Sequence, residues 1–174
     1  MKKTLIIAEA GVNHNGNFLI AEKLIEEASF AGADIIKFQS FNTEKLVTKN
    51  APKANYQIKD NNDSKTQLEM LKKFELNDKQ HELLIEHCKK FNIEFLSTGF
   101  DDKSIEMLEK FELKRHKIPS GEITNLPYLR KIGSLHKPVV MSTGMATLKE
   151  INAGMKILMN AGLEKKNLTV LHCN

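Results

Sequence analysis

Two lysines stand in apolar stretches of this sequence where buried strands are expected. Lys37 lies in ADIIKFQSF, and Lys117 lies in LKRHKIPSG. A lysine is rarely buried without a partner, and in a strand between two layers its ammonium group reaches water only at the strand's end. Polar residues follow each lysine, Gln39 in the first stretch and Ser120 in the second. We therefore expect both lysines to face a pocket that binds an anion.

The same polar bias recurs in the carboxyl-terminal half of each of six expected strands. The amino-terminal halves (LII, DII, EFL, VV and TVL) are apolar, except in the fourth strand. In parallel α/β sheets, ligands bind at the carboxyl ends of the strands. Lysines with Ser and Thr hydroxyls suit a phosphate and a carboxylate, and glutamates suit proton transfer or hydroxyl recognition. In chain order the polar positions are Glu9, Lys37, Gln39, Ser97, Thr98, Lys117, Ser120, Glu122, Ser142, Thr143, His172 and Asn174.

Glycine-containing segments lie beside these positions. GVNHNG, STGF, SGE and STGM could let backbone N–H groups approach an anion. None is followed by GK[ST] and none reads GxGxxG, so neither a P-loop nor a dinucleotide site is predicted. His172 could equally be a core histidine or a ligand.

Strands and helices alternate along the whole chain. Such alternation predicts a parallel sheet with crossover helices. A doubly wound sheet would be complete at this length, whereas a (β/α)₈ barrel needs about 250 residues. The last strand has no helix to cover it, and a free apolar edge is an aggregation liability, so we expect an α/β TIM barrel truncated after its sixth strand. The expected strands are 4–11, 33–41, 93–100, 113–121, 137–145 and 167–174; the helices are 18–32, 67–76, 77–92, 101–112, 125–135 and 147–162; and 42–65 is a long loop.

Composition excludes several classes of protein. The chain has 174 residues, 41% hydrophobic and 28% charged, which suffices for one domain with a core. The net charge of +4 is spread without a basic block and aromatic residues make up 6%, so no nucleic-acid partner is expected. Cys88 and Cys173 form no CxxC and fit a reducing cytoplasm. The first apolar run breaks at Glu9, too early for a signal sequence, and no stretch reaches the length of a membrane helix.

Six segments in order resemble the sialic acid synthase family, which includes the N-acetylneuraminate, legionaminate and pseudaminate synthases. They are IIAEAGVNHNG, KFQSF, FLSTGF, KIPSGEITNLPYL, VVMSTGM and LHCN. The resemblance implies condensation of phosphoenolpyruvate with N-acetylmannosamine or a close analogue, giving a nine-carbon sialic-acid-type sugar and phosphate. The family has a (β/α)₈ barrel followed by an antifreeze-like domain, and works as a homodimer with a divalent metal, usually Mn²⁺. Residues 1–174 would then be the amino-terminal part of the barrel.

The resemblance also implies roles for single residues. Glu9 would contact sugar hydroxyls, Glu122 would be the acid/base candidate, and Gln39 would lie beside the phosphoenolpyruvate site. The metal ligands and the antifreeze-like domain are expected outside this chain, which alone should be inactive. Gly99 departs from the proline frequent in the family, which loosens that loop. The residues expected to hold the phosphate and carboxylate of phosphoenolpyruvate are Lys37, Thr98, Lys117 and Ser120.

Two other interpretations stay open. An aldolase-type barrel could use Lys37 or Lys117 as a Schiff-base nucleophile, which borohydride trapping with a ketone would reveal. A non-enzymatic α/β binding module, complete as it stands, would melt cooperatively as a monomer. The loop at 42–66 is expected to reach over the site or across a dimer interface.

Overall fold

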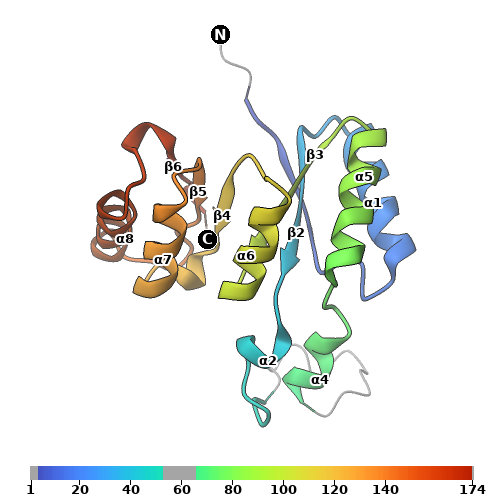
Figure 1. Ribbon diagram of the computed structural model, residues 1–174, viewed down its shortest axis with the longest axis horizontal. Coiled ribbons are helices and arrows are strands. Elements are labelled where there is room, and N and C mark those ends of the chain that lie inside the picture. The colour runs from blue at the N-terminus through green and yellow to red at the C-terminus, as the bar shows by residue number, and fades with distance from the viewer. Residues whose placement is uncertain (1–3, 53–65, 174) are drawn as a thin grey trace.

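The computed structural model describes residues 4–52 and 66–173 of the chain, in which strands and helices alternate as predicted (Figure 1). No helix in these ranges is long and apolar enough to cross a membrane. The strands are β1 (Ile7–Gly11), β2 (Ile35–Ser40), β3 (Glu94–Gly99), β4 (His116–Ile118), β5 (Val139–Met141) and β6 (Leu168–Val170). The α-helices are α1 (Phe18–Phe30), α2 (Thr43–Leu46), α4 (Gln67–Lys72), α5 (Asp78–Lys90), α6 (Asp102–Lys110), α7 (Leu126–Ser134) and α8 (Leu148–Asn160), with short 3₁₀ helices η1 (Ser120–Glu122) and η2 (Lys165–Asn167).

The strands form two parallel sheets in sequential order, β1-β2-β3 and β4-β5-β6. β3 and β4 also contact each other, but no strand pairing joins the two sheets. In the first sheet, Glu9 lies opposite Lys37 and Gln39 lies opposite Thr98. This register gathers the polar positions predicted on three strands at one end of the sheet.

Helices cover one face of the first sheet. Because side chains alternate along a strand, Ile36 and Phe38 of β2 and Phe95 of β3 point to the same side, where they pack with Ile25 of α1 and Leu84 of α5. α1 and α5 lie side by side there (Figure 1). Sequential order with one-sided helical cover differs from a doubly wound sheet, which has helices on both faces, so that alternative is wrong for these strands. The opposite face carries the lysine.

The second sheet is covered in the same way. Ile118 and Met141 form a buried cluster with Leu129 of α7 and Leu158 of α8. α7 and α8 approach closely at Gly133, where an added Cβ would lie 2.6 Å from the Leu158 carbonyl oxygen. Alternation leaves Lys117 on the face of β4 away from these helices.

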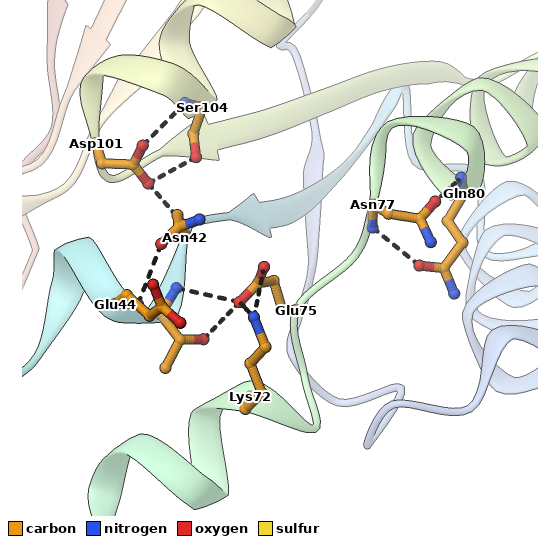
Figure 2. A network of polar contacts seen from close by, with 9 residues as sticks. Asn42, Glu44, Lys72, Glu75, Asn77, Gln80, Asp101 and Ser104 are labelled. Carbon is orange, nitrogen blue, oxygen red and sulfur yellow. Dashed lines mark hydrogen bonds and ion pairs between the residues drawn. The ribbon is translucent and has the colours of Figure 1, made fainter. Parts of the chain in front are cut away.

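Helix starts follow the capping residues. The N-cap predicted at residue 77 or 78 is Asn77, which forms a capping box with Gln80 through two hydrogen bonds of 2.9 Å (Figure 2). Thr147 caps α8 as predicted, again in a capping box, with Glu150. These bonds satisfy N–H groups that the first helical turn leaves without partners.

Several element predictions are wrong in detail. The expected loop at 42–65 contains α2, whose N-cap Asn42 accepts a hydrogen bond from the Glu44 amide at 3.1 Å; residues 53–65 lie outside the described ranges. The expected strand at 113–121 ends at Ile118, because Pro119 has no N–H for a strand ladder, and η1 follows. The expected strand at 137–145 ends at Met141.

A polar network fixes the chain where it leaves β2 (Figure 2). The backbone amide of Asn42 donates to Asp101 at 2.7 Å. The Thr43 hydroxyl donates to Glu75 at 2.7 Å, and the Thr43 backbone amide donates to it at 3.1 Å. Burial raises the pKa of Glu75, but the hydrogen bonds from Thr43 and Lys72 outweigh it and hold this pKa below its ordinary value. The exit of β2 is thus bound both to the start of α6 and to the segment before α5.

A candidate anion-binding site at the strand ends

Lys37 is held between two side chains on neighbouring strands. Its Nζ lies 2.7 Å from Glu9 Oε2 and donates to Thr98 Oγ1 at 3.2 Å. The lysine side chain is 8% exposed, whereas that of Glu9 is 53% exposed. Because an ammonium group only donates, the Thr98 oxygen accepts here and its own hydroxyl proton stays available for a ligand. Lys37 and Thr98 therefore offer one ammonium group, which Glu9 also engages, and one O–H donor.

Lys117 forms a second pair of the same kind in the other sheet. Its Nζ donates to Ser142 Oγ at 2.5 Å and to the Ile118 carbonyl at 2.8 Å, and the Ser142 hydroxyl also hydrogen-bonds the Cys173 sulfur. Burial, and then the positive charge of Lys37, lower the pKa of Lys117 to about 8, against the opposing influence of the Glu9 and Cys173 charges. The two lysines are thus close enough for their charges to interact.

Cys173 and Thr143 border the second pair. The Thr143 amide donates to Cys173 Sγ at 3.4 Å, and its hydroxyl donates to the Leu171 carbonyl at 2.6 Å. The Thr143 amide lowers the pKa of the Cys173 thiol. The sequence marks Ser142 and Thr143 as polar strand-end residues, but their contacts across strands depend on register and could not be predicted.

The other predicted residues divide into two groups. Gln39 lies opposite Thr98 on the lysine face, and a Cβ added at Gly11 would lie 3.6 Å from its Nε2. Ser120 and Glu122 lie instead on η1, partly exposed, and Glu122 accepts a hydrogen bond from Asn125 at 2.6 Å. The structure therefore brings together Glu9, Lys37, Gln39, Thr98 and Lys117, and places Ser120 and Glu122 on the turn after β4.

Two further expectations concern histidine and metal. His172 is exposed in the part of the protein that this chain represents. Within residues 4–52 and 66–173, no group of three or more His, Cys, Asp or Glu residues could hold a metal ion. Glu9 is already engaged by Lys37. The described donor set is cationic and hydroxylic, and it fits an anion rather than a metal.

These features define a class: a parallel α/β protein whose strand ends carry two ammonium–hydroxyl pairs for an anionic ligand. The sequence model described as the NeuB family matches residues 24–174, and the chain belongs to this family. The resemblance seen in the six sequence segments is thereby confirmed.

Individual relatives agree with this assignment. The chain is 54% identical to N,N'-diacetyllegionaminic acid synthase of Campylobacter jejuni over 99% of its own length and 52% of the relative's. It is 46% identical to the Legionella pneumophila synthase of the same name, covering 97% of this chain and 48% of the relative. The crystal structure of N-acetylneuraminic acid synthetase from Leptospira borgpetersenii, in complex with citrate, superposes with a TM-score of 0.81 at 31% identity, over 98% of this chain and 54% of that one. The chain thus spans about half the length of these relatives.

Proposed function

We propose that this chain is part of a synthase that condenses phosphoenolpyruvate with an N-acetylated hexose, such as N-acetylmannosamine or a close analogue. The product would be a nine-carbon sialic-acid-type sugar, and phosphate would be released. One observation carries the proposal: Lys37 with Thr98 and Lys117 with Ser142 form two cationic, hydroxyl-bearing pairs whose lysine charges interact. The relatives are synthases of acidic sugars, which supports the same reaction class.

Phosphoenolpyruvate suits two such pairs because it carries two anionic groups, a phosphate and a carboxylate. In this proposal each lysine contributes charge and each neighbouring hydroxyl contributes a directed hydrogen bond. Ser120, on the turn after Lys117, would add a third hydroxyl, and the Gln39 amide would lie beside the bound molecule. Binding would also reduce the repulsion between the two ammonium groups. Without a ligand, the Glu9 carboxylate offsets part of this repulsion.

The two glutamates would serve the sugar and the proton transfers. Glu9 holds Lys37, and its carboxylate is half exposed, so it can also accept hydrogen bonds from sugar hydroxyls. Glu122 is oriented by Asn125 and would exchange protons near the reacting carbons. Carbon 3 of phosphoenolpyruvate would attack the sugar aldehyde, water would add at carbon 2, and phosphate would leave. The lysines would stabilise the charge that collects on the departing phosphate.

The complete protein would have further parts. We propose a (β/α)₈ barrel of which this chain forms about six strands, an antifreeze-like domain, a homodimer and a cytoplasmic location. A divalent metal, Mn²⁺ in the family, would have its ligands outside this chain, because the described residues do not fit a metal site.

The test is a comparison of products. The complete protein that contains this sequence is incubated with phosphoenolpyruvate, an N-acetylated hexose and Mn²⁺, and phosphate release and a nine-carbon keto acid are measured together. We expect both in equal amounts, and no turnover by the 174-residue chain alone. Phosphate release without the keto acid would refute the condensation. Metal-dependent turnover by the 174-residue chain alone would refute the proposal that the metal ligands lie outside it.

A Schiff-base aldolase is a second candidate because one observation favours it. Lys117 is buried and has a pKa of about 8, which places a neutral amine within reach at mildly alkaline pH. Borohydride with pyruvate distinguishes the two functions. A reduced adduct on Lys117 would support the aldolase, whereas a ligand bound only by hydrogen bonds gives none.

A further inference from the structure

A buried chain of hydrogen bonds lies behind the candidate site, on the opposite face of β2 and β3. Strand alternation sends Ser40 and Ser97 toward α5, while Lys37 and Thr98 point away from it. His81 of α5 completes the chain: its Nε2 lies 2.6 Å from Ser40 Oγ, which in turn lies 2.7 Å from Ser97 Oγ. Ser40 and Ser97 are each 1% exposed and His81 is fully buried.

The surroundings determine which atom donates in each of these bonds. His81 Nδ1 lies 2.9 Å from the Asn77 carbonyl oxygen, which can only accept, so Nδ1 carries the proton. Burial lowers the pKa of the imidazole, which therefore stays neutral and leaves Nε2 as an acceptor. Ser40 must then donate its single proton to Nε2, and Ser97 must donate to Ser40. Each donor in the chain thus has one acceptor.

The Ser40–Ser97 hydrogen bond and the Lys37–Thr98 hydrogen bond join the same two strands along opposite diagonals. Ser40 lies two residues beyond the strand partner of Ser97, whereas Lys37 lies two residues before the partner of Thr98. One bond resists sliding of β2 against β3 in one direction, and the other resists sliding in the reverse direction. Register matters here because a slip of one residue would turn each side chain to the other face.

We propose that His81, Ser40 and Ser97 are positioning residues for phosphoenolpyruvate. They brace the ends of β2 and β3 from behind, so that the Thr98 hydroxyl and the Lys37 ammonium group stay at the spacing that the ligand needs. None of the three contacts the ligand. The inference rests on the proposed function, since it assumes that phosphoenolpyruvate binds at these strand ends.

Ser97→Ala is the sharpest variant. It removes the bond between the two strands but lets Ser40 keep donating to His81, so no buried donor loses its acceptor. Without this hydrogen bond the Thr98 hydroxyl is held less firmly, and the dissociation constant of phosphoenolpyruvate should rise about threefold to tenfold. Isothermal titration measures this change. Hydrogen exchange of the Thr98 amide should quicken, while that of Ile35, at the other end of β2, should not.

Ser29→Ala is the matched control. The Ser29 hydroxyl donates to the Phe91 carbonyl at 2.8 Å, where α1 and α5 end, on the same side of the sheet but away from the lysines. It should lower the melting temperature as much as Ser97→Ala does, with no change in the dissociation constant.

The possible outcomes distinguish the positioning role of His81, Ser40 and Ser97, called the brace below, from the proposed binding of phosphoenolpyruvate. If both variants leave binding and Thr98 exchange unchanged, or change them equally, the serines serve stability alone and the brace is wrong. If the unaltered chain does not bind phosphoenolpyruvate, the proposed function fails for this chain, and Thr98 exchange in Ser97→Ala decides the brace by itself. A ¹⁵N spectrum that places the His81 proton on Nε2 would overturn the donor directions and with them the brace.

Discussion

Replacing Lys37 by methionine removes the ammonium group and keeps most of the side-chain volume. The lysine makes two polar contacts, to Glu9 at 2.7 Å and to Thr98 at 3.2 Å, and in the proposed site a third to the anion. A hydrogen bond to a charged group contributes about 1.5–3 kcal/mol. Its loss should weaken phosphoenolpyruvate binding about 10- to 150-fold. The Glu9 carboxylate, left without its partner, would repel the anion and add to the effect.

Two assays follow this variant. Isothermal titration of the chain gives the dissociation constant of phosphoenolpyruvate, and steady-state kinetics of the complete protein give KM for each substrate. KM for phosphoenolpyruvate should rise far more than KM for the sugar. Lys79→Met is the control, because Lys79 also pairs with a glutamate, Glu82, at 3.0 Å, but is 74% exposed. Equal effects on both substrates, or no effect of Lys37→Met beyond that of the control, would refute the assignment.

Three further predictions concern pH and packing. Phosphoenolpyruvate binding should weaken above pH 8, by about tenfold per pH unit, as Lys117 with its pKa of about 8 loses its proton; a dissociation constant that stays flat to pH 9.5 would contradict this. Burial lowers the pKa of His14 and of His81 below the unfolded value. The stability that these neutral histidines contribute is therefore complete above pH 6.5 and is lost as pH falls below it. Urea unfolding at pH 7 and pH 5 measures this loss, and equal stability at the two pH values would contradict it. Gly133→Ala should destabilise the chain by about 1–3 kcal/mol in the same assay, because its Cβ would meet the backbone of α8, and an unchanged midpoint would show that the helices can separate without cost.

The order of the elements could be predicted from the sequence because hydrophobic periodicity and capping residues are local signals. Asn77 and Thr147 begin helices as their positions indicate. The ends of strands were less predictable: the strand expected to reach residue 121 ends at Ile118, because Pro119 cannot donate to the strand ladder. The short helix α2 was missed because its stability comes from Asp101 and Glu75, which are distant in sequence.

The candidate site could be predicted only in part. The sequence singles out Lys37 and Lys117 because a charge in an apolar strand needs a partner, and the polar residues in the carboxyl-terminal halves of the strands predict the end of the sheet at which such residues gather. The partner of each lysine does not follow, because Glu9, Thr98 and Ser142 reach the lysines through the register of neighbouring strands within each sheet. The brace behind the site was missed for the same reason: Ser40 and His81 meet across 41 positions of sequence.

The claim that Lys37 and Lys117 share one anion is tested most directly by NMR of their side chains. The ¹⁵N and ¹³Cε signals of both lysines are followed while phosphoenolpyruvate is added to the chain, with the two assigned by Lys37→Met and Lys117→Met. Both signals should move along one binding curve with a single dissociation constant, and the pKa of Lys117 should rise from about 8 as the anion offsets the charge of Lys37. A response of only one lysine, or two curves with different dissociation constants, would contradict the shared site.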